Sequence, residues 1–284
     1  MTPPAGRRPS RPPPRRRPPA GPAGPPGARR PRGRDPRGLG GEQVEGRRAV
    51  RELLAAGRRR VRELSVAEGL DPSPVLAEIL DLAAAARVAV RTVGRGRLDG
   101  MAATDAPQGV VARAAPLAEA DLEELARPGG GEPPFLLLLD GVTDPHNLGA
   151  LLRTAACAGA TGAVLPRHRA VHVTPTVAKA AAGAIEHLPI AVVPGMPTAL
   201  AALGRAGVWT VGLDAGAAQS VFDLPLGPEP VALVLGAEGG GLSRLVRRRC
   251  DVVAGIPQRG ALASLNVAAA GAVACFELAR RRAR

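Results

Sequence analysis

Apolar residues recur along the chain with two periods, and each period predicts a different kind of element. Helical spacing and strand patterns alternate over residues 42–115, with helices expected at 46–57 and 72–86 and strands at 61–66, 88–93 and 108–114. Asp71 followed by Pro72 is typical of a helix start, so we expect Asp71 to cap the second helix. The alternation predicts a compact α/β domain over residues 42–115.

The pattern changes after a Gly/Pro-rich segment, which we interpret as a linker over residues 116–133. Continuous apolar runs predict strands at 135–140, 162–166, 190–193, 208–214, 231–236 and 251–257. Helical spacing lies between these runs, at 148–159, 174–186, 198–207 and 242–250, and a last helix is expected from Ser264 onward. Uninterrupted apolar strands alternating with helices are typical of a parallel sheet covered on both faces. The sequence therefore predicts a second α/β domain over residues 134–284.

The first 41 residues differ from the rest in composition. They contain eleven arginines, thirteen prolines, eight glycines and one aspartate, and so carry a net charge of +10 out of +13 for the whole chain. Such a segment buries too little apolar surface to offset its ordering entropy, and we expect residues 1–41 to be disordered. A basic tail attracts any polyanion without sequence preference. Weak RNA binding and a passive extension both remain open.

The cysteines and the apolar segments bear on the compartment. Cys157, Cys250 and Cys275 are odd in number and form no CxxC pair, which favours reduced structural thiols. The first thirty residues have no apolar segment typical of a secretory signal, and no apolar window is long enough for a membrane span. We expect a cytoplasmic protein without a metal and without membrane contact.

Three loops follow predicted strands, where ligands bind in open α/β sheets. The first loop contains Asn147, which could cap the next helix, and Arg153 six residues later. The second, residues 236–243, is rich in glycine and holds one charge, Glu238. It lacks the Gly-Lys-Ser/Thr of a P-loop and the GxGxxG of a dinucleotide site. Taken singly, each of these features is also compatible with an ordinary cap, surface residue or turn.

The third loop runs from Ile256 to a polar trio, Ser264, Leu265 and Asn266. A helix made almost wholly of small residues follows, over 268–274. Small side chains allow a helix to approach another backbone closely, and free N–H groups point outward at a helix N-terminus. The loop thus combines close packing with hydroxyl and amide groups that face whatever approaches.

Together the three loops resemble the three motifs of the SpoU/TrmH family of RNA ribose 2′-O-methyltransferases, in the SPOUT superfamily. The matching residues are Asn147, Gly149, Arg153 and Ala155, then Gly236, Glu238 and Gly241, then Ile256, Pro257, Gly260, Ser264, Leu265 and Asn266. The segments 45–50 and 108–112 resemble the family's L30e-like substrate-binding domain. The chain departs from the family pattern at Pro107 and Ala268.

The resemblance implies a deep trefoil knot in the C-terminal part of the α/β domain, a homodimer, and S-adenosylmethionine bound between the second and third motifs. It implies that backbone at Gly236, Ile256 and Leu265 holds the cofactor, and that the loop at Gly260 approaches it closely. It also explains the helix of small residues, which has to pass through a knot and pack in a dimer.

The resemblance further implies a catalytic set, which consists of Asn147, Arg153, Glu238, Ser264 and Asn266. A guanidinium is not deprotonated in proteins, so we interpret Arg153 as a donor that orients the 2′-oxygen and stabilises developing negative charge, rather than as a general base. Family members with this N-terminal domain resemble enzymes that methylate guanosine in 23S ribosomal RNA. Guanosine in transfer RNA is the alternative substrate, and a non-catalytic RNA-binding protein is the alternative of another class.

Overall fold

The computed structural model describes residues 38–168 and 172–283, in which two sheets are formed. The first sheet has the order β1-β4-β2-β3 and consists of β1 (Gln43–Glu45), β2 (Val61–Ala67), β3 (Ala89–Val93) and β4 (Val110–Ala114). Only β2 and β3 are parallel; β4 is antiparallel to both β1 and β2. Helices α1 (Arg47–Ala56) and α2 (Pro74–Ala85) pack on each other and bury an aliphatic core against this sheet.

Two details of this region differ from the sequence prediction. Helix α2 begins at Pro74, and its cap is Ser73, whose Oγ accepts a hydrogen bond from the Leu76 N–H at 3.3 Å. The expected Asp71 cap is therefore wrong, because Ser73-Pro74 provides the same start signal two residues later. Helix α3 (Arg95–Met101) was not predicted, since Leu98 is its one buried residue and gives no periodic signal.

The second sheet has eight strands in the order β10-β12-β9-β11-β6-β7-β8-β5, and every neighbouring pair is parallel. Its strands are β5 (Glu119–Ala120), β6 (Phe135–Asp140), β7 (Gly162–Pro166), β8 (Ile190–Val193), β9 (Trp209–Leu213), β10 (Gln219–Ser220), β11 (Val231–Gly236) and β12 (Val252–Gly255). The six apolar runs are β6, β7, β8, β9, β11 and β12, which confirms the predicted parallel α/β sheet.

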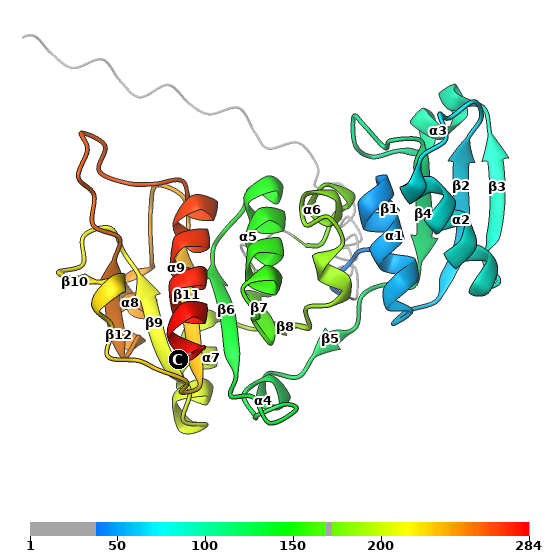
Figure 1. Ribbon diagram of the computed structural model, residues 1–284. Coiled ribbons are helices and arrows are strands. Elements are labelled where there is room, and N and C mark those ends of the chain that lie inside the picture. The colour runs from blue at the N-terminus through cyan, green and yellow to red at the C-terminus, as the bar shows by residue number, and fades with distance from the viewer. Residues whose placement is uncertain (1–37, 169–171, 284) are drawn as a thin grey trace, which may run out of the picture. The chain divides into compact units, whose positions relative to one another are not determined.

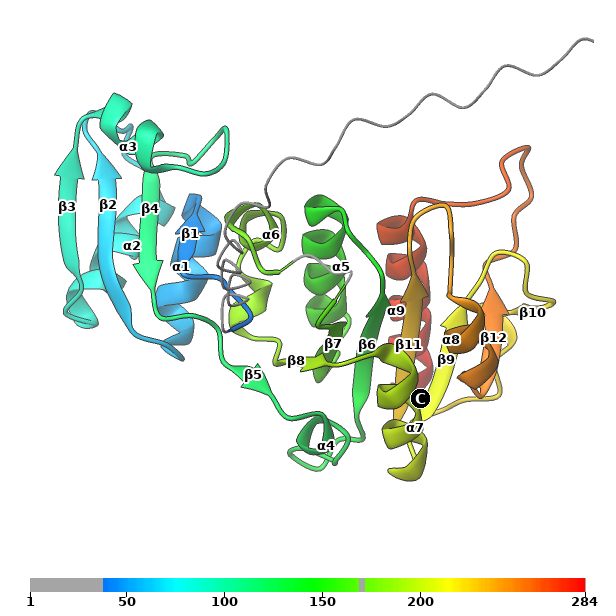
Figure 2. The same ribbon diagram turned by 180° about the vertical axis from the view of Figure 1, so that it is seen from behind.

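Helices cover both faces of this sheet (Figures 1 and 2). On one face lie α5 (Pro145–Cys157), α6 (Pro175–Ala180) and α9 (Val267–Arg282); on the other lie α7 (Met196–Arg205) and α8 (Arg244–Arg249). Successive residues of β6 enter different cores: Leu137 and Leu139 pack toward α5 and α9, whereas Leu136 and Leu138 pack toward α7. Two-sided burial explains why this strand is an uninterrupted apolar run.

The helix expected over 174–186 is broken in the structure. Helix α6 ends at Ala180, and a 3₁₀ turn, η1, spans Ala184–Glu186. Between them Ala182 and Gly183 have positive φ of 49° and 88°. A side chain at Gly183 would meet Glu52 Cβ at 2.3 Å, so the glycine allows close approach of α1.

The predicted linker and tail are partly integrated into the fold. Within 116–133, β5 pairs with β8 and a short helix, α4 (Leu122–Leu125), follows it. Residues 38–41 were expected to be disordered, but Leu39 is only 2% exposed and the Gly41 N–H donates to Val173 O at 2.8 Å. The tail prediction is wrong for these four residues because Leu39 finds an apolar core; its remainder, 1–37, lies outside the described residues.

A buried ion pair links the segment between α1 and β2 to the 3₁₀ turn η1. The Arg59 guanidinium makes two bonds to the Glu186 carboxylate, at 2.6 and 2.9 Å, and the two side chains are 6% and 1% exposed. Arg59 also donates to the carbonyls of Gly41 and Ala115. Removing one partner of such a pair would leave an uncompensated buried charge, at a cost of about 3–5 kcal/mol.

Helix α9 lies very close to its neighbours at Gly271. A Cβ there would lie 2.3 Å from Leu151 Cδ2 of α5 and 2.9 Å from Leu235 Cδ1 of β11. The absence of a side chain at Gly271 therefore allows close packing of α9 on the side chains of α5 and β11, whereas Ala269 and Val273 of the same helix are exposed. The knot expected for this part of the chain stays a prediction. Across the described residues, no helix combines the length and apolarity that crossing a membrane requires.

We expect Gly271→Val to lower the free energy of unfolding by about 1–3 kcal/mol, because the new side chain overpacks the α5–α9–β11 contact. Gly204→Val is the matched control, since Gly204 is also helical, in α7, and its Cβ would meet nothing within 4 Å. Urea unfolding measures both variants. Equal midpoints for the two would show that Gly271 is not a packing position.

Candidate active site

The loops that the sequence singled out meet at one edge of the large sheet. Strands β6 and β11 pair in register, with Asp140 opposite Gly236, so the first and second loops begin side by side. The third loop leaves β12, two strands away, and returns to Asn266 at the start of α9, which packs on α5 and β11. The parallel ends of β6 and β11 bring Asp140 and Gly236 together, and the third loop brings Asn266 to the same edge of the sheet.

A chain of side-chain hydrogen bonds joins the three loops. Asn266 Nδ2 donates to Asn147 Oδ1 at 3.2 Å, and Asn147 Nδ2 donates to the Glu238 carboxylate. Each motif contributes one member. Asn266 is further held at its own Oδ1, which accepts from the backbone N–H groups of Ala268 and Ala269. Orientation of the two amides is therefore set by backbone at one end and by a carboxylate at the other.

The helix caps at the site differ from those expected. Helix α5 starts at Pro145, and its cap is Asp144, whose Oδ2 accepts from the Asn147 N–H at 2.8 Å. Asn147 is therefore not a cap: it lies inside the first turn, which frees its amide for Glu238 and Asn266. Conversely Asn266 caps α9, which begins at Val267 rather than at Ser264.

The Gly-rich loop is a tight turn. Ala237 and Gly241 exchange two backbone hydrogen bonds, with N···O distances of 3.0 and 2.8 Å, and Gly239 and Gly241 have positive φ. A Cβ on Gly236 would lie only 2.0 Å from the carbonyl carbon of Gly241. Only glycine fits at the end of β11, because the returning backbone occupies the space of a side chain.

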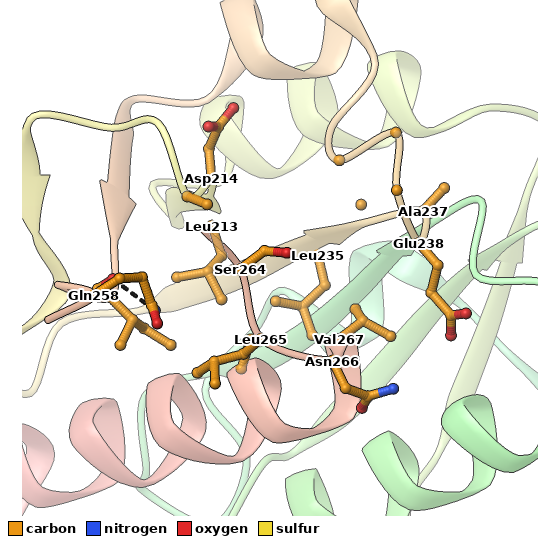
Figure 3. A pocket seen from close by; sticks show the side chains of 17 residues that line it. Leu213, Asp214, Leu235, Ala237, Glu238, Gln258, Ser264, Leu265, Asn266 and Val267 are labelled. Atoms are coloured by element: carbon orange, nitrogen blue, oxygen red, sulfur yellow. Dashed lines mark hydrogen bonds between the residues drawn. The ribbon is translucent and has the colours of Figure 1, made fainter. Parts of the chain in front are cut away.

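A cavity of about 560 Å³ opens between the Gly-rich loop, the end of β9 and the third loop (Figure 3). Its apolar lining includes Leu213, Leu235, Ile256, Leu265 and Val267, and its polar lining includes Asp214, Glu238, Gln258, Ser264 and Asn266. A cavity of this size that combines apolar surface with convergent polar groups is typical of a small-molecule or cofactor site.

Most of the predicted site residues lie at this cavity. Gly236, Glu238, Ile256, Ser264, Leu265 and Asn266 line it, and Asn147 bonds to two of them. Gly260 does not line it, and a Cβ at Gly260 would meet nothing within 4 Å, so the close approach expected there has no counterpart in the geometry. Arg153 does not line it either. It is exposed on α5, on a helix face about 120° away from Asn147.

Asp214 is a charged lining residue that sequence reasoning missed. Asp214 directly follows β9, and its carboxylate accepts from the Gly216 N–H at 2.8 Å and from Arg247 Nε of α8 at 2.8 Å. The Gly216 hydrogen bond and, next, the Arg247 guanidinium lower the pKa of Asp214, although partial burial opposes them. A signal existed, since Asp214 ends a predicted parallel strand, where ligands bind.

The cysteines take no part in the site. Burial raises the pKa of the Cys275 thiol to about 12, and burial together with Asp251 and Asp140 raises that of Cys250 to about 12. Both thiols stay protonated at neutral pH and are poor nucleophiles. Within residues 38–168 and 172–283, no group of three His, Cys, Asp or Glu side chains is placed to hold a metal ion.

The fold and the site together are those of an α/β protein with a small-molecule cavity at the strand ends of its parallel sheet. A small α/β domain precedes this sheet. The model of the SpoU rRNA Methylase family matches residues 134–276, and the model described as RNA 2′-O ribose methyltransferase substrate binding matches residues 43–120. The chain belongs to the SpoU rRNA methylase family. This confirms the resemblance predicted from the sequence and the prediction of an RNA 2′-O-ribose methyltransferase.

Relatives extend over nearly the whole chain. The 23S rRNA (guanosine-2′-O-)-methyltransferase RlmB of Pseudomonas putida is 40% identical over 244 residues, which is 85% of this chain and 97% of that protein. The RlmB of Pseudomonas aeruginosa is 41% identical over 244 residues, again 85% and 97% of the two chains.

Two solved structures are also similar. The SpoU methyltransferase AviRb from Streptomyces viridochromogenes has a TM-score of 0.70 and 28% identity, covering 85% of this chain and 89% of that one. An AdoMet-bound rRNA methyltransferase from Sinorhizobium meliloti has a TM-score of 0.69 and 28% identity, covering 84% and 86%.

Proposed function

We propose that this protein transfers a methyl group from S-adenosylmethionine to the ribose 2′-hydroxyl of a guanosine in 23S ribosomal RNA, in the cytoplasm. The observation that carries the proposal is the hydrogen-bonded set Asn147, Glu238 and Asn266 at the rim of the 560 Å³ cavity. Relatives that are about 40% identical over 85% of the chain carry this activity in their names, which supports the choice of substrate.

The residues at the cavity fit the cofactor. Leu213, Leu235, Ile256, Leu265 and Val267 offer apolar surface for a purine. Asp214 and Glu238 place carboxylates at the same cavity, which suits a ligand that carries positive charge and hydrogen-bond donors. S-adenosylmethionine supplies an activated methyl group when it is bound. Backbone at Gly236, Ile256 and Leu265 is proposed to hold it.

The protein then has to orient the ribose of the substrate guanosine and stabilise the negative charge that develops on its 2′-oxygen. Asn147 and Asn266 have fixed amides that can hold the ribose hydroxyl beside the cavity, and Ser264 adds a hydroxyl to the same rim. Glu238 sets the orientation of the Asn147 amide. Arg153 is proposed to orient the 2′-oxygen or a neighbouring phosphate and to stabilise negative charge as the proton leaves.

The N-terminal domain, proposed over residues 42–115, presents RNA to the methyltransferase domain, proposed over 134–284.

The test of the proposed activity is transfer of labelled methyl from S-adenosylmethionine to rRNA from a strain that lacks this modification, followed by mapping of the methylated nucleotide. Incorporation at the 2′-oxygen of a single 23S guanosine is the expected result.

Total transfer RNA is the necessary parallel substrate. Methylation of transfer RNA with none in 23S RNA would replace the proposed substrate by the alternative one. Binding of RNA without methyl transfer to either would favour a non-catalytic role. The Arg153→Ala protein serves as the negative control for both substrates.

We further propose a homodimer that forms through the outer face of α9. Exposed residues recur at helical spacing on this face: Ala269, Val273 and Phe276. Phe276 is 51% exposed and Val273 is 37% exposed, and Leu265, just before the N-terminus of α9, is 43% exposed. A helix face with large exposed apolar side chains is typical of a protein–protein contact.

Phe276→Arg is expected to shift the protein from dimer to monomer at micromolar concentration, because a charge would be buried without a partner. Leu80→Arg in α2 is the matched control, since Leu80 is also a partly exposed apolar residue of a helix, at 39%. Size-exclusion chromatography with light scattering reads out both. A Phe276→Arg protein that stays dimeric would rule out this face.

A further inference from the structure

We infer that Asp214 recognises the ribose diol of the adenosyl group, and so acts as a specificity-determining residue for the cofactor. This inference rests on the proposed function, because it assumes that the cavity binds S-adenosylmethionine. Asp214 lies outside the three motif loops, whereas all the predicted cofactor contacts lie within them.

The position separates Asp214 from the reacting groups. Asp214 and Leu213 lie on one side of the cavity, whereas Ala237 and Glu238 lie on the opposite side (Figure 3). Asn147 and Asn266 belong to the Glu238 side through their hydrogen bonds. The methyl group has to face that side, because the RNA ribose is oriented there. The Asp214 side therefore receives a part of the cofactor that does not react.

The apolar lining indicates which part this is. Leu213, Leu235, Ile256 and Leu265 supply the cavity with apolar surface, and Leu213 directly precedes Asp214 in the chain. A purine is the flat, mostly apolar portion of S-adenosylmethionine, and its attached ribose carries two neighbouring hydroxyls. Asp214, which directly follows β9, supplies a carboxylate to the same cavity, where the ribose of a purine bound on this surface can meet it. A carboxylate after a parallel strand that accepts from ribose hydroxyls is a recurrent arrangement in nucleotide-binding α/β sheets.

Two hydrogen bonds hold the Asp214 carboxylate in one orientation, as an acceptor for ribose hydroxyls requires. Gly216 N–H binds Oδ1 and Arg247 Nε binds Oδ2, each at 2.8 Å, which fixes the rotation of the group. These same bonds favour the ionised form, which is the form that only accepts hydrogen bonds. Each oxygen of an ionised carboxylate has a second lone pair, so two hydroxyl donors can still bind. The side chains of Arg247 and Asp214 are 47% and 24% exposed, and Asp214 lines the cavity, so its two hydrogen-bond partners do not enclose the carboxylate.

The test is calorimetric binding of S-adenosylmethionine and S-adenosylhomocysteine to wild-type protein and to Asp214→Asn. Loss of hydrogen bonds to a charged acceptor predicts a rise in Kd of about ten- to a hundredfold for both ligands. Asp81→Asn, a change of the same type at an exposed position of helix α2, is the matched control and should bind like wild type. Wild-type protein that binds neither ligand would refute the proposed function itself rather than the role of Asp214.

A second ligand pair tests the contact directly. S-adenosylhomocysteine is compared with its analogue that lacks both ribose hydroxyls. Wild-type protein should lose about ten- to a hundredfold in affinity for the analogue, whereas Asp214→Asn should bind the two ligands nearly equally. If the substitution merely distorted the loop, removing the hydroxyls would weaken both proteins by the same factor. That result, or a substitution that weakens only the positively charged ligand, would overturn the inference.

Discussion

Arg153→Ala is expected to lower the rate of methyl transfer by about 100- to 1,000-fold, the typical effect of removing a donor that stabilises charge in a transition state. The affinity for S-adenosylmethionine should change little, since Arg153 does not line the cavity. Single-turnover methyl transfer and calorimetric cofactor binding measure the two quantities. Arg205→Ala, which removes an exposed arginine from the last turn of α7, is the control and should leave both quantities near wild type.

Arg153→Lys separates two roles for this residue. If Arg153 acts as a fork of donors, lysine should also fail, because an ammonium cannot make the same bidentate contacts. A lysine variant whose activity rises steeply with pH would instead support proton acceptance and contradict our interpretation.

The exposed position of Arg153 also calls for a test of which chain it serves. An Arg153→Ala chain can be co-expressed with a chain whose cavity is disabled, using a different tag on each. In the proposed homodimer, activity of the purified mixed species would mean that Arg153 acts on the cavity of the partner chain. An inactive mixed dimer would mean that it acts within its own chain.

Gly236→Ala is expected to raise the Kd for S-adenosylmethionine by about a hundredfold or more. The added Cβ would overlap the Gly241 backbone, whose carbonyl carbon and oxygen would lie 2.0 and 2.1 Å away. The turn has to open, and the two Ala237–Gly241 hydrogen bonds break. Overpacking and the lost bonds together cost about 3 kcal/mol, which is about a hundredfold in affinity.

Gly195→Ala is the matched control for this change. Gly195 also follows a strand of the large sheet, has extended backbone, and its Cβ would meet only Pro197 Cδ at 3.9 Å. Calorimetry should show wild-type affinity for this variant, and circular dichroism should show that both variants are folded. Normal affinity in a folded Gly236→Ala protein would mean that the Gly-rich turn does not shape the cofactor site.

The sequence by itself determined the architecture of the large sheet. Six uninterrupted apolar runs predicted its main strands because a strand buried on both faces has no polar positions, as the two cores around β6 show. Short elements at the margins escaped prediction. Strands β1, β5 and β10 have two or three residues each, too few to show a period, and they exist because a neighbouring strand offers free hydrogen-bonding groups.

For the site, the sequence determined which loops carry the chemistry, since glycines and polar residues after apolar strands stand out locally. Only the tertiary structure decided how their side chains meet. Asn147 bonds to Glu238, 91 residues away, because β6 and β11 are neighbours in register. Asp214 joins the same cavity through strand order, and Arg59 meets Glu186 across 127 residues through packing. Local patterns record the burial and conformation of a segment, whereas such pairings depend on which segments become neighbours, and that is settled only when the whole chain packs.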